Sequence, residues 1–374
     1  QLLAGDPARE RVDVVHLHHL AVELLTEARG RGLKLADRQA IGKAAKVAAD
    51  AISTKSITPA FLEAEWNMVV DPYGVTSWED YAVVDRAARG SSLNRAQREL
   101  AWRGIEAMRA SLVSAELTTW STVCWELVEH LDAGSDHPYA HVIADEAQDF
   151  GPGELRLLRA LAPSAANDVF LASDANQRIF KPYTPVARAG LEVRGRSVTL
   201  RVNYRMTEQI RRVAEGIIAG KVDCDEPTAG SVSLLAGLEP EVIVAPGVTV
   251  EIQRVADWLK KLVANGYRPG QIAIFARRKD IIQNRIHAAV KAAGLEVFNL
   301  DADDAPPSNR VAIGTMHRSK GLQFRAIAIM GVEDGTVPLN SVRTRQPDEA
   351  AQRAFVEMER NLLYVACSRR GSGC

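Results

Sequence analysis

Cysteine, long apolar runs and net charge are all in short supply in this sequence, and each shortage excludes a class of protein. The four cysteines, Cys124, Cys224, Cys367 and Cys374, form no C-x-x-C pair, which argues against a disulfide framework and against a structural zinc site. No uninterrupted apolar run reaches the roughly 18 residues of a membrane-spanning helix, and the start of the chain has no basic-then-apolar signal pattern. We therefore predict a cytoplasmic protein without a membrane partner.

The charge of the chain is nearly balanced. It has 46 Lys and Arg residues against 47 Asp and Glu residues, a formal net charge of -1. Such a chain has no overall basic field that would attract nucleic acid, so any contact of that kind must come from local patches. With 374 residues, 47% of them hydrophobic, the chain is long enough for two or three domains.

The chain is organised around residues 141–149, His-Val-Ile-Ala-Asp-Glu-Ala-Gln-Asp. The apolar part is typical of a buried strand, and a Gly-Pro pair then breaks the chain before a helix predicted from Glu154. Acids at the carboxyl end of a parallel strand suit a metal-nucleotide site, where Asp145 holds Mg²⁺ through water and Glu146 orients or deprotonates an attacking water. The competing interpretation is that these acids cap a helix or form a surface turn.

Two further strands are predicted to end in polar residues. The second strand is followed by Asp174 and Gln177. If it runs parallel to the first strand, these side chains share one sheet edge with the earlier acids. The third strand ends at Tyr204 and Arg205. An arginine suits phosphate oxygens because its guanidinium is planar and permanently charged, and a tyrosine offers a face for a base.

Residues 26–138 have a mostly helical pattern, clearest over 36–51 and 94–113. Five of the six tryptophans lie in this region, and we favour helix packing over base stacking for them. The arginines around Gly90 form the strongest local basic cluster, either a solvated helix face or a phosphate contact. They are Arg86, Arg89, Arg95 and Arg98.

The segment from residue 11 to about residue 26 is predicted to be a short strand that runs into an amphipathic helix, and it carries three histidines. A metal site is the less favoured interpretation of His16, His18 and His19, because no acidic or cysteine ligand is paired with them and they fit a strand-to-helix turn.

A second α/β unit is predicted after residue 230. The pattern indicates strands over 271–276, 295–300 and 326–330, a further strand from 310, and helices over 281–293 and 350–367. The strand from 310 leads into a polar turn with Thr315, His317 and Lys320, and the last helix ends at Ser368-Arg369-Arg370.

Six segments, in order along the chain, resemble the motifs of the UvrD/Rep-like superfamily 1 helicases. The Asp-Glu-Ala-Gln-Asp stretch is similar to the second helicase motif. The first segment is similar to the one that follows the family's first DNA-contacting motif, and the others are similar to motifs three to six. The six segments are residues 14–25, 145–149, 173–180, 200–205, 311–324 and 359–369.

The resemblance implies an α/β fold with two RecA-like parallel-sheet motor domains. Residues 1–25 and 139–215 would form the first domain, interrupted by a helical insertion over 26–138, and residues 216–374 the second. Only about a dozen residues separate Phe298 from the motif-five strand, where larger relatives insert an accessory domain, so no large insertion is expected there. ATP would bind between the motor domains, and single-stranded DNA would cross them.

The resemblance also assigns roles residue by residue. Asp145 would coordinate Mg²⁺, Glu146 would be the catalytic base, Gln177 would sense the γ-phosphate, and Tyr204 would stack on adenine. The remaining assignments place Arg205 and Arg369 on the γ-phosphate, Gln323 on the ribose and Phe180, Thr315, His317 and Lys320 at the nucleic acid. Gln323 stands where the family usually has Glu, which weakens its assignment.

One family motif is absent from the sequence. No G-x-x-x-x-G-K-[ST] phosphate loop occurs: Gly42-Lys43 and Gly220-Lys221 lack the required glycine and hydroxyl. We interpret this as truncation, and expect this chain alone to hydrolyse ATP poorly or not at all. Lys181-Pro182-Tyr183 also replaces the family's usual Arg-Gly pair, which weakens the DNA contacts assigned there.

Two functions follow from the sequence. The first is an ATP- and Mg²⁺-dependent helicase or translocase that moves 3′ to 5′ on single-stranded or partly duplex DNA. The second is a non-catalytic module, derived from such a motor, that binds nucleic acid or a partner. The first function is favoured because a binding module has no chemical need for all five of the motor's nucleotide-site residues. These are Asp145, Glu146, Gln177, Arg205 and Arg369.

Overall fold

The computed structural model describes residues 10–54, 56–84, 86, 93–134, 136–179, 184–219, 231–300, 306–346 and 349–369. Their contacts divide the chain into two compact units, residues 1–173 with 182–194 and residues 174–181 with 195–374. The fold is mixed α/β and its paired strands are parallel, as the sequence predicts. None of the helices in the described ranges is long and apolar enough to cross a membrane.

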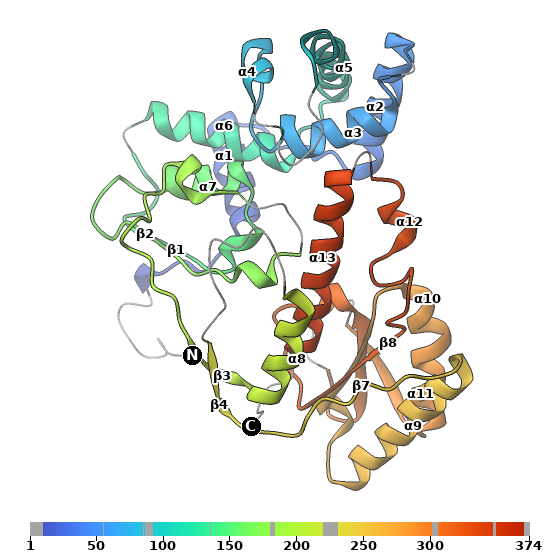
Figure 1. The fold of residues 1–374 in the computed structure, drawn as a ribbon. Coiled ribbons are helices and arrows are strands. Elements are labelled where there is room, and N and C mark those ends of the chain that lie inside the picture. Colours follow the sequence, from blue (N-terminus) through green and yellow to red (C-terminus); the bar gives the residue numbers. More distant parts are fainter. Residues whose placement is uncertain are drawn as a thin grey trace. The chain divides into compact units, whose positions relative to one another are not determined.

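The first unit is mainly helical (Figure 1). Asn94 and Gln97 form a reciprocal capping box at the start of the predicted helix 94–113, which satisfies two amide groups that the helix itself leaves without partners. The elements of this unit are α1 (Leu17–Arg29), α2 (Arg38–Ile52), α3 (Pro59–Glu65), the π-turn η2 (Trp66–Val70), α4 (Trp78–Val83), α5 (Arg95–Ser114), α6 (Trp120–Ala133), β1 (Val142–Ala144), η4 (Ala147–Asp149), α7 (Pro152–Ala160), β2 (Val169–Leu171) and η6 (Val186–Ala189).

The helices from α2 to α5 enclose a hydrophobic core of their own. Trp66 and Trp102 are buried in it, which confirms the packing interpretation for these two residues. Trp125 also has a structural role. Its ring would lie 2.7 Å from a Cβ added to Gly74, whose φ is +61°, so both the conformation and the close approach require glycine there.

A buried ion pair lies inside this helical core. Arg86 donates from Nε and Nη2 to the two carboxylate oxygens of Glu65 at 2.6 and 2.8 Å, and the Tyr81 hydroxyl donates to Glu65 Oε1 at 2.8 Å. Arg98 donates to the Tyr81 and Ala82 carbonyls. The phosphate-contact interpretation of the basic cluster is therefore wrong for Arg86, and Arg98 is already bound to the backbone. Arg89 lies outside the described residues.

The short strand predicted at the start of the segment 11–26 is not formed. Glu10 and Arg11 lie in a 3-10 turn, residues 12–16 are in neither a helix nor a strand, and Val14 is 93% exposed. An apolar run at the surface gains nothing from the extended conformation unless a neighbouring strand supplies hydrogen bonds. His16 caps α1, and no group of metal-ligating side chains occurs in the described ranges.

The two strands of the first unit pair in parallel, with Ala144 opposite Leu171. Hydrogen bonds between Ala144, Ala147 and Ala172 continue the pairing past the strand ends. Ile143 and Phe170 are 80% and 63% exposed and lie opposite each other. The prediction that these strands are buried holds for one face only.

The second unit is built on a parallel sheet of four strands in the order β6-β7-β5-β8 (Figure 1). A separate two-stranded parallel sheet joins β3 to β4. The elements are η5 (Ala175–Gln177), β3 (Val202–Thr207), α8 (Glu208–Ile218), β4 (Val232–Leu235), α9 (Val248–Ala264), η7 (Pro269–Gln271), β5 (Ile272–Ala276), α10 (Lys279–Ile281), η8 (Ile282–Ile286), α11 (His287–Ala292), β6 (Glu296–Asn299), β7 (Arg310–Thr315), η9 (Met316–Ser319), β8 (Ala326–Met330), α12 (Asn340–Arg343) and α13 (Glu349–Cys367).

Each face of the four-stranded sheet has its own core. Ile272 and Ile274 of β5 point toward α9 and α11, whereas Ala273 and Phe275 point toward α8 and α13. A parallel strand covered on both faces is apolar without alternation, which is why the run 271–276 could be recognised as a strand. The predicted strands and helices of this part of the chain are confirmed, with a π-turn, η8, inside the helix predicted over 281–293.

The buried Glu65–Arg86 pair gives a stability prediction. Glu65→Ala leaves the Arg86 guanidinium buried without its carboxylate, so we expect the free energy of unfolding to fall by about 3–5 kcal/mol. Urea unfolding followed by tryptophan fluorescence measures the loss. Glu99→Ala is the matched control, because Glu99 pairs with Arg95 at the surface and exposed pairs of this kind contribute about 0.3–0.5 kcal/mol. Equal losses of unfolding free energy in the two variants would show that the buried pair stabilises the protein no more than the exposed pair.

Candidate functional site

The acidic residues of the Asp-Glu-Ala-Gln-Asp stretch follow β1 directly. Asp145 is exposed, and its Oδ1 accepts the Glu146 amide at 2.8 Å. Glu146 has φ 55° and ψ 35°, the left-handed region that a non-glycine residue adopts at a cost of about 1–3 kcal/mol. Its Oε2 accepts a hydrogen bond from the Gln148 side chain. The turn therefore places two carboxylates at the carboxyl end of the strand and orients the second.

The helix after this stretch is anchored by a buried carboxylate. Glu154, 2% exposed, accepts the Gly151 amide at 3.0 Å and closes the first turn of α7. His18 Nε2 of α1 lies 3.3 Å from the other Glu154 oxygen. His18 thus contacts the helix that follows the acidic stretch.

In the second unit, the segment 174–179 brings two predicted site residues together. Asp174 accepts the Gln177 side-chain amide at 2.8 Å. At the other end of that side chain, Gln177 Oε1 accepts from Arg369 Nη2 at 2.9 Å. Arg369 is 2% exposed and also donates to the Val365 carbonyl and the Ser368 hydroxyl. Gln177 and Arg369 are therefore direct hydrogen-bond partners.

The backbone of the same segment is bound from two other elements. Lys320 Nζ lies 3.3 Å from the Gln177 carbonyl, and the Asn361 side-chain amide donates to the Arg178 carbonyl at 2.8 Å. Lys320 and Gln177 are thus brought together in the second unit. The assignment of Lys320 to nucleic acid stays a prediction.

A second buried group surrounds His317, after the end of β7. Arg277, which follows β5, donates to both carboxylate oxygens of Glu359 at 2.8 and 3.0 Å, and Glu359 also accepts the Leu339 amide. Burial lowers the pKa of His317, the positive charge of Arg277 lowers it further, and the charge of Glu359 partly opposes the shift. His317 is therefore neutral near pH 7.

The remaining predicted residues are more scattered. Tyr204 and Arg205 lie inside β3, not at its end, and both are exposed, Tyr204 at 70%. Thr315 ends β7, and Gln323 is exposed in the loop before β8. Phe180 lies outside the described residues.

The sequence interpretation missed Arg277, Glu359 and Asn361 as parts of this site. A signal was present for the first, because a basic residue directly follows the carboxyl end of an apolar parallel strand. Glu359 and Asn361 stand within a helix, and their contacts join elements far apart in the chain. Nothing in the local pattern indicates those partners.

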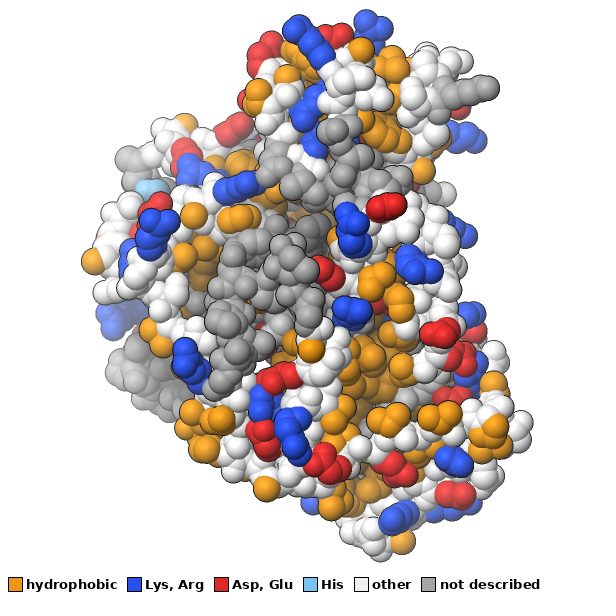
Figure 2. All heavy atoms as spheres, in the orientation of Figure 1, with side chains coloured by type: hydrophobic (Ala, Val, Ile, Leu, Met, Phe, Trp, Pro, Cys, Tyr) orange, Lys and Arg blue, Asp and Glu red, His pale blue; other side chains and the backbone are white. Residues whose placement is uncertain are grey.

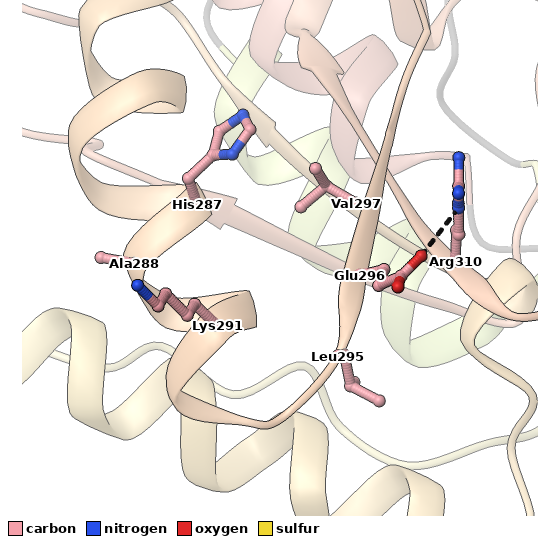
Figure 3. Close-up of a pocket in the computed structure, with 7 residues that line it drawn as sticks. All are labelled: His287, Ala288, Lys291, Leu295, Glu296, Val297 and Arg310. Atoms are coloured by element: carbon pink, nitrogen blue, oxygen red, sulfur yellow. Dashed lines mark hydrogen bonds and ion pairs between the residues drawn. The ribbon is translucent and has the colours of Figure 1, made fainter.

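A surface depression of about 470 Å³ lies elsewhere in the second unit, between α11 and the start of β6 and β7 (Figure 3). Glu296 and Arg310, the first residues of these strands, pair at 3.1 Å. The depression is thus at the amino end of the strands, whereas Thr315 and His317 lie at the carboxyl end of β7.

On the face drawn in Figure 2, acidic and basic side chains are interspersed.

Comparison with known proteins gives matches over the last part of the chain. Residues 299–370 match the family described as UvrD-like helicase C-terminal domain. The putative ATP-dependent DNA helicase YjcD of Bacillus subtilis is 48% identical over 61 residues, 16% of this chain and 8% of the relative. The ATP-dependent DNA helicase PcrA of Staphylococcus epidermidis is 36% identical over 70 residues, 18% of this chain and 9% of the relative.

The ATP-dependent DNA helicase Rep of Buchnera aphidicola is 34% identical over 68 residues, 17% of this chain and 10% of the relative. Each of these matches spans a tenth of the relative's length or less. The family match contains β7, β8 and α13, and with them Thr315, His317 and Arg369.

The lowered pKa of His317 predicts a pH effect on stability. In the unfolded chain, His317 takes up a proton near pH 6.5. In the folded protein it does so at a lower pH. Between these two pH values the unfolded state therefore binds more protons. We expect stability to fall as the pH drops from about 7.5 to about 5.5, and His317→Gln to remove that part of the loss. Urea midpoints of both proteins at several pH values measure it. Parallel curves for the two proteins would contradict the prediction.

Proposed function

We propose that this chain, whose residues 299–370 match the UvrD-like helicase C-terminal domain family, is the body of an ATP-dependent DNA helicase or translocase. The observation that carries the proposal is the hydrogen bond from Arg369 of the family-matched region to Gln177. A guanidinium hydrogen-bonded to an amide is suited to detecting a terminal phosphate, because the guanidinium keeps its positive charge and its bond to the amide depends on where the guanidinium lies.

In the proposed site, Asp145 holds Mg²⁺ and Glu146 is the base that activates water. Asp145 is exposed at the end of a parallel strand, where an oxygen ligand for Mg²⁺ is accessible. Bound Mg²⁺ would neutralise charge on the phosphates of ATP. Glu146 is kept in one orientation by its left-handed backbone and by Gln148, which suits a group that must face a water molecule.

Arg369 has a second proposed task. In this structure its Nη2 donates to Gln177 and it is buried. We propose that Arg369 exchanges Gln177 for a phosphate oxygen when ATP is bound, which leaves the Gln177 amide oxygen without that donor. The exchange would transmit the nucleotide state to the segment 174–179. Tyr204 and Arg205, exposed on β3, are proposed to contact the adenine and the phosphates.

The finer architecture is also a proposal. The helices α2 to α5, with their own core, are assigned to an insertion in the first motor domain. The doubly covered sheet β6-β7-β5-β8 is assigned to the second motor domain. Only residues 300–309 separate β6 from β7, which supports the absence of a large accessory insertion at that point.

The proposed substrate is single-stranded or partly duplex DNA, with 3′ to 5′ movement. The turn at the end of β7, with Thr315, His317 and Lys320, is proposed to couple the nucleotide site to the DNA strand. The supporting contact is that of Lys320 with the Gln177 carbonyl. With balanced charge overall, contact must depend on such local groups. The relatives named above are DNA helicases, which supports DNA over RNA.

The first test is DNA-stimulated ATP hydrolysis by the full product of the parent reading frame, because these 374 residues contain no phosphate loop. In Glu146→Gln we expect kcat to fall about 10²- to 10⁴-fold, because the general base is lost, while ATP still binds. Glu126→Gln, a change in an exposed ion pair of α6, is the matched control and should keep wild-type turnover. If the wild-type product has no turnover, the motor proposal fails and a non-catalytic binding module becomes the better account.

The second test concerns Arg369. Arg369→Lys keeps the charge but removes the planar fork, so we expect kcat to fall about 10³-fold, the lower end of an arginine's contribution to phosphoryl transfer. Arg360→Lys, on the exposed side of the same helix, should stay close to wild type. Thermal unfolding of both variants checks that the fold is kept. Normal turnover in a folded Arg369→Lys protein would remove Arg369 from the proposed mechanism.

A further inference from the structure

We propose that Asn361 is a positioning residue that holds the Gln177 segment in register with Arg369. The inference rests on the proposed function, since Gln177 and Arg369 are its assumed nucleotide sensors. Asn361 itself is assigned no contact with nucleotide or DNA. Its side-chain amide donates to the Arg178 carbonyl at 2.8 Å, one residue beyond the side chain whose position matters.

The geometry of α13 supports this role. Asn361, Val365 and Arg369 are spaced four residues apart and so follow one stripe of the helix and its C-terminal turn. The two polar residues of that stripe are about 12 Å apart along the axis, given a rise of about 1.5 Å per residue. One binds the main chain of Arg178 and the other the side chain of Gln177. The stripe therefore holds the segment at two points.

The segment has little structure of its own to set its position. The 3-10 helix η5 has only three residues, Ala175–Gln177, and a helix this short makes few internal hydrogen bonds. Ile179 anchors the far side by entering the core beside α13. Lys320 adds a longer contact of 3.3 Å to the Gln177 carbonyl. The contact of Asn361 with this backbone is shorter than that of Lys320, and Asn361 is 4% exposed.

The burial of Asn361 makes its contact selective. A buried amide that loses its acceptor is left with an unmade hydrogen bond, which is unfavourable, so the Arg178 carbonyl is held at one place. The loop is therefore restricted to the position in which Gln177 contacts Arg369. A displacement of about 1 Å at a catalytic group can lower the rate about 10²-fold, and preventing it is the role proposed for Asn361.

The test compares Asn361→Leu with wild type in the full product of the reading frame. Leu has a similar volume but no donor, so we expect kcat for DNA-stimulated ATP hydrolysis to fall about 10- to 100-fold. KM for ATP and the affinity for a single-stranded oligonucleotide should stay near wild type, because Asn361 touches neither. Asn361→Gln, which keeps the donor, should recover part of kcat. Gln352→Leu makes the same kind of change near the start of α13 and is the matched control.

A double substitution separates positioning from general stability. If Asn361 acts only by placing Gln177, then Asn361→Leu should cost nothing further in a protein that already carries Gln177→Ala. Independent, multiplied losses would overturn the inference, as would a normal kcat in Asn361→Leu. If Asn361→Leu does not fold, Asn361→Asp, which keeps the size of the side chain, goes through the same measurements.

Hydrogen exchange on the 374-residue chain gives a readout that needs no turnover. In Asn361→Leu we expect faster exchange in peptides covering residues 174–179, with unchanged exchange in β5 and β7. If exchange in 174–179 is unchanged, the inference fails even when the motor proposal stands. If the wild-type product shows no turnover but exchange in 174–179 rises, the proposed function fails and the positioning contact remains.

Discussion

Several contacts of the second unit depend on one buried guanidinium, that of Arg369. Arg369 is 2% exposed, and a charge with so little access to water must have its N–H groups bound, because the desolvation cost is several kcal/mol. The acceptors come from the Val365 carbonyl, Ser368 and Gln177. The first two are supplied by the end of α13 itself. The third requires the segment 174–179 to reach α13, so the burial of one arginine ties a loop to a helix nearly two hundred residues away in sequence.

The parallel sheet explains why polar groups gather on one side of this unit. Parallel strands end together, so the residues that follow them meet at one edge. Arg277 follows β5 and His317 follows β7, and α13 supplies Glu359 between them. Burial then separates their electrostatic roles: Arg277 and Glu359 form a bidentate pair, whereas His317 stays neutral because its pKa is lowered.

The helical part of the first unit follows a different rule. Its core is formed by neighbouring helices, and the buried ion pair of Glu65 with Arg86 is satisfied by two guanidinium donors and the Tyr81 hydroxyl. Hydrophobic spacing predicted the helices well, because α2 and α5 repeat their buried residues at helical intervals. The same spacing could not show that Arg86 turns inward. From the sequence alone, a run of arginines beside glycine and serine indicates a solvated or phosphate-binding surface, and only the position of Glu65 on α3 reverses that expectation.

The sequence by itself determined many of the helices and strands, because periodicity and strand-end chemistry are local properties. It correctly indicated β5, β7, β8, α5 and α13, and it brought Gln177 and Arg369 into one hypothesis through resemblance. The tertiary structure decided which residues meet. It placed Tyr204 and Arg205 within a strand, left residues 11–16 unpaired, and joined Asn361 to Arg178 and Arg277 to Glu359. Such pairings depend on the packing of distant segments and on the need of every buried polar group for a partner, and neither can be read from a local pattern.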